Sequence, residues 1–81
     1  MADAHRPLYE IADEIELYWK KPYFGAVPYM EAMRLCDRIT DSYGQDSAKS
    51  IVLYFLSNAA QFRGPNARRI KAELKQIAGI K

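Results

Sequence analysis

Hydrophobic residues recur along this chain at the three- and four-residue spacing of amphipathic helices. Four segments carry the pattern: residues 7–21, 28–41, 46–62 and 66–79. The third is apolar almost all round, which is typical of a buried helix, although its run IVLYFL taken alone also fits a strand. We therefore predict an all-α fold, a compact bundle of four short helices around a central, buried third helix.

Prolines and glycines mark the ends of these segments. Pro22 is expected to end the first helix, and Pro28 to begin the second. Asp46 or Ser47 can cap the third helix by accepting from free backbone N–H groups, and the Gly-Pro pair at 64–65 separates it from the fourth. No glycine-rich phosphate loop is present, because each glycine stands alone at an expected helix boundary: Gly25, Gly44, Gly64 and Gly79.

The size of the chain limits the core that these helices can build. Eighty-one residues make one domain, 1–81, in which residues 1–6 are expected to fray. Such a domain buries only about 60% of its unfolded surface. With six Tyr, three Phe and one Trp it can bury more by self-association, so a homo-oligomer is a candidate state. The predicted core is Leu8, Ile11, Ile15, Tyr18, Trp19, Met33, Cys36, Ile51, Val52, Phe55, Ala59, Phe62, Ile70, Leu74 and Ile77.

The stretch KKPYFGAVPY, residues 20–29, is unusually aromatic for a connection between helices, since loops normally run over the wet surface. Phe24 is expected to fold back as a plug on the end of the bundle, and it is also counted with Tyr23, Lys20 and Lys21 among the candidate protein-interaction residues. Tyr23, beside Lys20 and Lys21, is expected to be the exposed contact for a partner protein.

One flank of the third helix is a second candidate for contact with a protein. Small residues and a single leucine line it, and small residues let a second helix approach closely. A partly exposed flank and a self-association surface are both compatible with this pattern. The residues are Ser50, Leu53, Ser57 and Ala60.

Charge is divided unevenly along the chain, whose net charge is +2. Residues 1–62 hold six Lys/Arg and nine Asp/Glu, a sum of −3, whereas residues 63–81 hold six against one, a sum of +5. A basic helix can bind nucleic acid in a salt-sensitive way. The acidic face of the first helix (Glu10, Asp13, Glu14 and Glu16) can instead pair with it, and we rank solvation or such pairing above nucleic-acid binding. The candidate nucleic-acid residues are Arg63, Arg68, Arg69, Lys71 and Lys75.

Residue types that carry catalysis are sparse. His5 is the only histidine and lies in the segment expected to fray. Cys36 lies on a predicted helix without a base nearby in sequence, so we expect a small core residue and not a nucleophile. Exposed carboxylates on the acidic face keep ordinary pKa values and make poor catalysts. We predict no enzyme, no catalytic residues, no metal site and no cofactor.

Nothing in the chain indicates a membrane or an oxidising compartment. Its single cysteine excludes an intrachain disulfide. The N-terminal MADAHRPLYE lacks the apolar core of a signal peptide, and the longest strongly apolar run, residues 51–56, is too short to cross a bilayer. We predict a cytoplasmic protein with no membrane partner.

Three strings, YFGAVPYMEAM, DSYGQDSAKSIVLYFLSNA and RGPNARRIKAELK, carry a resemblance. Over residues 8–77 the chain resembles a group of short, mostly uncharacterised proteins from tailed-bacteriophage genomes. The most specific parts are residues 23–29, 50–59, 63–64 and 67–68. The group is expected to have Trp where this chain has Phe62, which suggests an aromatic packing site. The resemblance implies a phage or prophage source and an accessory role, without a mechanism.

These observations favour a non-enzymatic phage accessory protein in the cytoplasm of the infected bacterial host. It would act by protein–protein interaction, binding and inhibiting a host factor such as a defence component, or assembling with itself. Surplus aromatic residues beside the proline-rich connection support this, since such residues commonly dominate interfaces. The alternative is a small nucleic-acid-binding helical protein that uses its basic C-terminal helix.

Overall fold

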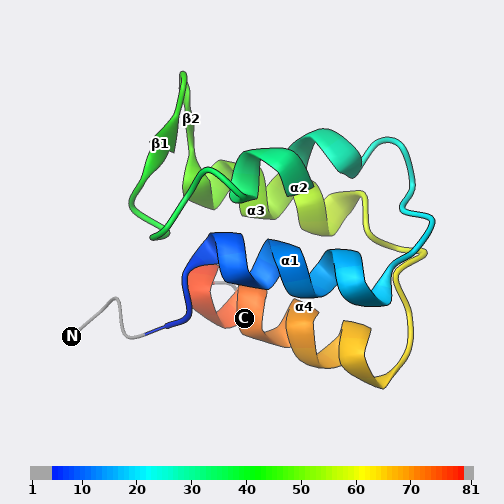
Figure 1. The fold of residues 1–81 in the computed structure, drawn as a ribbon. Helices are drawn as coiled ribbons and strands as arrows, with labels where there is room; N and C mark the ends of the chain where they lie inside the picture. Colours follow the sequence, from blue (N-terminus) through cyan, green and yellow to red (C-terminus); the bar gives the residue numbers. More distant parts are fainter. Residues whose placement is uncertain (1–4, 80–81) are drawn as a thin grey trace.

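A computed structural model describes residues 5–79, with only the backbone described at Tyr43. The chain folds into four helices and one short antiparallel hairpin (Figure 1). The elements are α1 (Leu8–Tyr18), α2 (Val27–Met33), β1 (Ser42–Tyr43), β2 (Asp46–Ser47), α3 (Ala48–Ser57) and α4 (Pro65–Ala78). The mainly helical class predicted from the sequence is confirmed, apart from the hairpin, in which Ser42 pairs with Ser47.

The helices pack as two pairs, with α2 and α3 above α1 and α4 in the view of Figure 1. Helix α3 packs chiefly against α2 and α4, and α1 chiefly against the same two helices. On α3, Leu53 and Tyr54 are exposed while Ile51, Val52 and Phe55 are buried. The expected central position of the third helix is therefore not confirmed.

The start of α1 is fixed by the segment that follows α2. The N–H groups of Leu8 and Tyr9 donate to the carbonyl oxygens of Asp37 and Cys36, at 2.9 and 3.0 Å. First-turn N–H groups have no partner within their own helix, so these bonds satisfy groups that would otherwise need water or a cap. They tie the beginning of α1 to the end of the α2 region.

Helix α2 is much shorter than the predicted range 28–41. After Met33 the backbone tightens, with the Cys36 N–H donating to the Met33 carbonyl at 3.1 Å, and the following carbonyls turn toward α1. The Asp41 carboxylate then accepts from the N–H groups of Asp37 and Arg38, at 2.8 and 3.0 Å. Gly44, expected to stop the helix, lies instead in the hairpin turn with φ +63°.

The caps of α3 and α4 agree with the sequence-based prediction better than the end of α2 does, although α3 ends earlier than predicted. The Ser50 N–H donates to the Ser47 side chain at 3.1 Å, so Ser47 caps α3 as expected. Gly64 precedes α4, Pro65 occupies its first turn, and Gly79 ends it in the left-handed conformation.

The core forms where the four helices meet, and the predicted core is buried at every position except Tyr18 and Ile77. Tyr18 is 45% exposed because α1 ends there and the chain turns Trp19 inward in its place. Ile77, in the last turn of α4, is only partly covered. The predicted core left out several smaller buried residues and one methionine, although the spacing placed three of them (12, 48 and 67) on apolar helix faces: Ala12, Ala26, Met30, Ala32, Ala48, Ala67 and Ala78.

The expected fraying of residues 1–6 falls mostly on residues 1–4, which lie outside the described residues. Arg6 contradicts it, because its guanidinium is bound by two carboxylates. Arg6 Nη2 lies 2.7 Å from Glu14 Oε1 and 2.7 Å from Glu73 Oε1.

Candidate binding surface

Two connectors meet at one end of the bundle, on the right of Figure 1. One joins α1 to α2 (residues 19–26) and the other joins α3 to α4 (residues 58–64); we call their meeting place the connector end. Trp19 of the first stacks on Phe62 of the second, with ring centroids 5.2 Å apart and an interplanar angle of 17°. Trp19 also meets Phe55 of α3 edge-on at 6.2 Å. These buried rings join the connectors to the core.

Gly25 lets the two connectors approach closely. A Cβ at this position would lie 2.9 Å from Asn58 Oδ1 and 2.6 Å from Cε2 of the Tyr23 ring. Asn58 is held in place, since its Nδ2 donates to the Tyr54 carbonyl at 2.8 Å. Any larger residue at 25 must displace the Tyr23 ring or the Asn58 amide.

Phe24 does not plug the end of the bundle, as the sequence led us to expect; its side chain is 80% exposed. Trp19 and Phe62 already fill that end. The N–H groups of Ala26 and Val27 donate to the carbonyls of Tyr23 and Phe24, at 2.8 and 3.3 Å, and this tight turn buries Ala26 instead. Phe24 projects outward, and the centroid of its ring lies 4.8 Å from that of the Tyr23 ring.

Tyr23 is 38% exposed and lines a hollow of about 250 Å³ with residues of α3 and the second connector. This aromatic hollow is formed by Tyr23, Ser57, Asn58, Ala60 and Gln61. The structure thus brings together two features that the sequence nominated separately, the aromatic connector and the small-residue flank of α3.

The flank itself is shorter than predicted. Ser50 belongs to the cap of α3, where its hydroxyl accepts from Ser47 Oγ at 3.1 Å, and it does not line the aromatic hollow. Leu53 is exposed one turn before Ser57, whose hydroxyl donates to the Leu53 carbonyl at 3.0 Å. Of the predicted flank, only Ser57 and Ala60 therefore line the aromatic hollow, with Leu53 exposed beyond them along α3.

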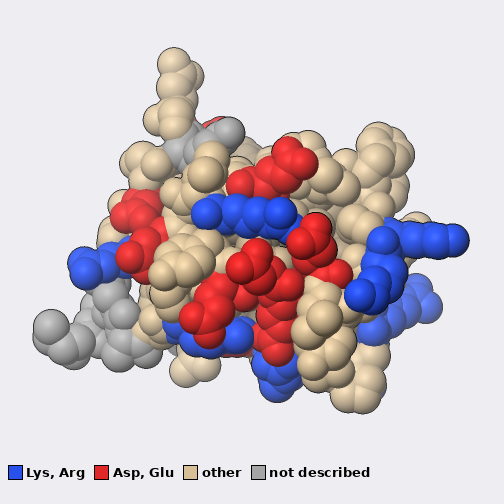
Figure 2. All heavy atoms as spheres, viewed as in Figure 1, with Lys and Arg blue, Asp and Glu red and all other residues tan. Residues whose placement is uncertain are grey.

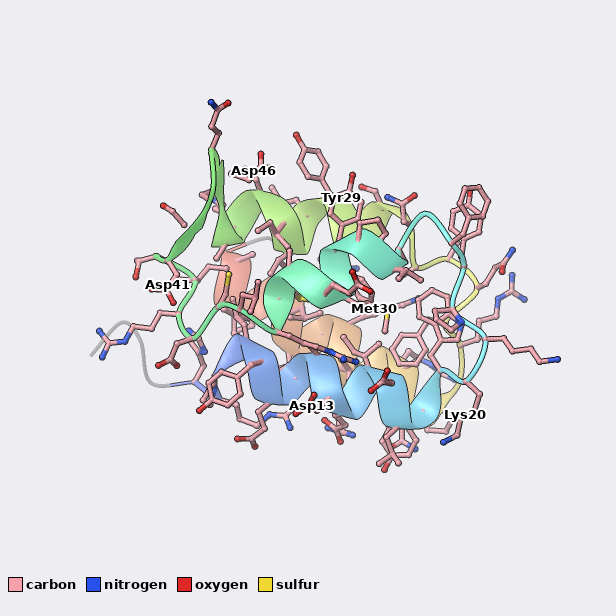
Figure 3. The ribbon with its side chains drawn as sticks, turned by 45° about the horizontal axis from the view of Figure 1, so that its top comes forward. Asp13, Lys20, Tyr29, Met30, Asp41 and Asp46 are labelled. Atoms are coloured by element: carbon pink, nitrogen blue, oxygen red, sulfur yellow. The ribbon has the colours of Figure 1, made fainter. Side chains whose placement is uncertain are left out.

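Positive charge collects at the connector end without any acidic residue beside it in sequence. Lys20 and Lys21 are both exposed, and Lys20 is seen at this end in Figure 3. Residues 17–30 and 58–72 contain no Asp or Glu. Figure 2 shows basic side chains without acidic neighbours at the right edge of one face, whereas the acidic side chains gathered over α1 have basic ones among them.

The basic residues predicted as candidates for nucleic-acid binding, Arg63 in the second connector and four on α4, divide into two groups. Arg69 pairs with the acidic face, its Nη2 lying 2.6 Å from Glu14 Oε2, so the expected pairing of the first and fourth helices is confirmed there. Arg63, Arg68 and Lys71 instead line a second hollow with Phe62 and Gly64, of about 280 Å³. We call this the basic hollow. Lys75 is exposed one turn beyond Lys71.

The acidic face is a bonded charge network. Arg6 also donates through Nε to Glu73 Oε2 at 2.9 Å, so one guanidinium joins α1 to α4. The hydrogen bond from Arg69 holds the pKa of Glu14 below its ordinary value, and Arg6 lowers it further, against the opposing effect of burial. Arg34 Nη2 lies 2.7 Å from Glu16 Oε1 and joins the end of α2 to α1.

Cys36, considered as a nucleophile, lies in the core. Burial there raises the pKa of its thiol, which disfavours the thiolate. Among the described residues, no three His, Cys, Asp or Glu side chains are arranged to hold a metal ion. No helix within residues 5–79 is both long and apolar enough to span a bilayer.

Asn58 and Gln61 were missed as surface residues because the pattern placed them inside the third helix, predicted to run to residue 62. The helix ends at Ser57, which moves both into the connector and into the aromatic hollow. The only signal in the sequence was polar residues just before Arg63 and the Gly-Pro pair.

Comparison with known proteins gives no relative: no family model, no curated protein and no solved structure matches this chain. The resemblance to short phage proteins stays a prediction. The geometry of the connector end is therefore the basis for any functional proposal.

Proposed function

We propose that this protein is a non-enzymatic binding protein that acts by protein–protein interaction through its connector end. The observation that carries the proposal is Phe24, an aromatic side chain 80% exposed on a turn with hydrogen-bonded backbone. Burying a phenylalanine side chain fully is worth about 1.5–3 kcal/mol, and at 80% exposure most of this free energy is not gained within the chain. Aromatic residues of this kind commonly supply most of the energy of an interface.

The partner is expected to combine an apolar pocket with an acidic rim. Phe24 and the Tyr23 ring beside it provide a pair of anchors, and the aromatic hollow next to them can accept a side chain in return. Lys20 and Lys21 flank these anchors with no acidic residue nearby in sequence, so carboxylates on the partner would meet complementary charge. Rim charges of this kind mainly speed association and select the partner.

The resemblance to short phage proteins guides the choice of partner. We propose a phage or prophage accessory protein that works in the cytoplasm of the bacterial host and binds a host protein, inhibiting a factor such as a defence component. Self-association through the same surface is the second candidate, since Leu53 and Ser57 extend it along α3.

Phe24→Ala tests the proposal, with Leu35→Ala as a matched control. Leu35 is 71% exposed and lies just after α2, outside the connector end, so both changes remove a similar exposed apolar group. The wild-type protein and both variants are used for affinity capture from a lysate of the native host. The captured partner is then titrated against each purified protein.

We expect the wild-type protein and Leu35→Ala to bind the same partner with equal affinity. Phe24→Ala should weaken binding by 2 kcal/mol or more, roughly thirtyfold. Equal binding by Phe24→Ala would overturn the connector end as the interface. No partner, together with a monomer in analytical ultracentrifugation, would overturn protein binding as the function.

A further inference from the structure

The positive side chains of this protein fall into two groups that differ in their partners. Arg6, Arg34 and Arg69 each have a nitrogen within 2.7 Å of a carboxylate oxygen. No carboxylate of the described residues lies within ion-pair distance of the three side chains that line the basic hollow: Arg63, Arg68 and Lys71. Three positive groups around one hollow repel one another unless an anion lies among them.

Lys71 is held against the wall of this hollow. It is only partly exposed, and its Nζ lies 5.8 Å from the centroid of the Phe62 ring. That ring is fixed by its stack on Trp19. Burial lowers the pKa of Lys71 from its ordinary value, and the charges of Lys75 and Arg63 lower it further. The cation is thus partly desolvated and crowded by like charge, and an oxyanion would relieve both costs.

Arg63 and the start of α4 add to the positive potential. Arg63 Nε donates to the Ala60 carbonyl at 3.3 Å, which orients the guanidinium and leaves its terminal nitrogens for another acceptor. Gly64 lines the hollow and precedes α4 without any side-chain cap, so the positive end of this 14-residue helix faces the same region. A hollow of about 280 Å³ leaves room for a tetrahedral oxyanion.

We propose that the basic hollow binds a phosphate group, and that a nucleic-acid strand supplies it. The choice of a strand follows from the row of cations beyond the hollow. Arg68, Lys71 and Lys75 lie on neighbouring turns of one α4 face, so the row extends roughly 10 Å along the helix, at 1.5 Å per residue. One free phosphate would engage only the hollow, whereas a strand offers successive phosphates to the whole row. Glu73, the one acidic residue near the row in sequence, is bound by Arg6.

This site is separate from the proposed protein interface, because Phe24 and Tyr23 do not line it. The test is a fluorescence titration of the full-length protein with labelled single-stranded and duplex oligonucleotides at two salt concentrations, and with inorganic phosphate as competitor. Lys71→Gln and Arg68→Gln remove cations of the hollow. Lys49→Gln is the matched control, since Lys49 is an exposed lysine on the first turn of α3, near the hairpin. Circular dichroism confirms that each variant is folded.

We expect the strand to bind at low salt, with affinity falling as salt rises. Lys71→Gln and Arg68→Gln should each weaken binding by about tenfold and reduce the salt slope by about one, while Lys49→Gln and Phe24→Ala leave both unchanged. Absence of binding at low salt would overturn the proposal. If Lys49→Gln lost as much strand affinity as Lys71→Gln, the binding would be diffuse charge attraction and the basic hollow would be overturned as the site. Binding of inorganic phosphate without binding of the strand would overturn the strand as the ligand.

Discussion

The acidic face of α1 and the connector end contain the same kinds of basic side chain in opposite circumstances. On the acidic face, Arg6 and Arg69 share Glu14, and each guanidinium spans two elements of the fold. Beside the connector end, Arg63 and Lys71 line the basic hollow together, and no carboxylate of the described residues lies within ion-pair distance of either. The position of the carboxylates therefore decides whether an arginine stabilises the fold or remains available to a ligand.

The two regions also differ in how far their apolar side chains are covered, although Tyr9, Leu17 and Tyr18 on the outer side of α1 are exposed as well. Around α1, the large apolar residues Leu8, Ile11 and Ile15 are fully buried beneath the charge network. At the connector end, Phe24 is exposed above a layer of buried rings. Exposed apolar groups and unpaired cations contribute little to stability, so the connector end is the region where substitutions should separate binding from folding.

The largest effect is expected where the connector end joins the core. Trp19→Ala removes the ring that stacks on Phe62 and meets Phe55, and the loss should be about 3–5 kcal/mol of unfolding free energy. In a domain of this size that is most of the stability, so urea unfolding followed by circular dichroism should show a largely unfolded protein. Trp19→Phe should retain most of it. A folded Trp19→Ala variant that lost less than about 1 kcal/mol of unfolding free energy would show that the Trp19 ring does not join the connectors to the core.

An intermediate effect is expected on the acidic face. Glu14→Gln weakens the bonds to Arg6 and Arg69 and should cost about 1–2 kcal/mol at pH 7, a value reduced by the partial exposure of the three side chains. Urea denaturation gives the free energy of unfolding directly. A variant as stable as the wild type would show that the charge network contributes nothing to the free energy of unfolding.

The same carboxylate predicts a pH dependence. The folded-state pKa of Glu14 is depressed, so its stabilisation is present above the ordinary glutamate value of about 4.3 and is lost as the pH falls toward the folded value. Unfolding free energies should be level between pH 7 and about pH 5 and decline below. Asp41, whose pKa is also lowered by the N–H groups of Arg38 and Asp37, contributes to the decline. Glu14→Gln should decline less steeply, and an identical slope would exclude Glu14 as a cause.

A smaller effect is expected at the contact between the connectors. Gly25→Ala places a Cβ against Asn58 and the Tyr23 ring and should cost about 1 kcal/mol. If the clash with Asn58 is the cause, Asn58→Ala and Gly25→Ala should be coupled, with a double variant less destabilised than the sum of the two. If the losses of unfolding free energy in the two single variants simply add in the double variant, the clash with Asn58 is not the cause.

The smallest effect on stability is expected at Phe24. Phe24→Ala should change the unfolding free energy by less than about 0.5 kcal/mol, because the ring contacts little besides Tyr23. Its effect on partner binding should be large by comparison. A substantial loss of stability would assign Phe24 to the fold and remove the contrast between the two regions.

The sequence predicted the number and order of the helices because apolar spacing and Gly or Pro boundaries are local signals. It could not predict that α2 ends at Met33, since that end depends on tertiary bonds from Leu8 and Tyr9 to carbonyls beyond it. It placed Trp19 correctly in the core, but it wrongly placed Phe24 on the end of the bundle as well. Trp19 and Phe24 are both close enough in sequence, and packing selected the one that could also stack on Phe62.

The candidate surface was predicted in its parts but not in its arrangement. The aromatic connector and the basic residues were both nominated from composition, and they converge on one end because two connectors meet there. Arg69 and Arg68 are adjacent in sequence, yet only Arg69 reaches Glu14. Their separation depends on which side of α4 faces α1, a property of helix packing that charge counting does not contain.

The bonds from Leu8 and Tyr9 to the carbonyls beyond α2 have a consequence for local opening. The first turn of a helix normally exchanges its amide hydrogens quickly, because these N–H groups face water. At the start of α1 they are engaged with a distant segment, so they should exchange only when α1 separates from the α2 region. In hydrogen-exchange mass spectrometry, the start of α1 should therefore be protected, while the start of α4, next to the basic hollow, exchanges early.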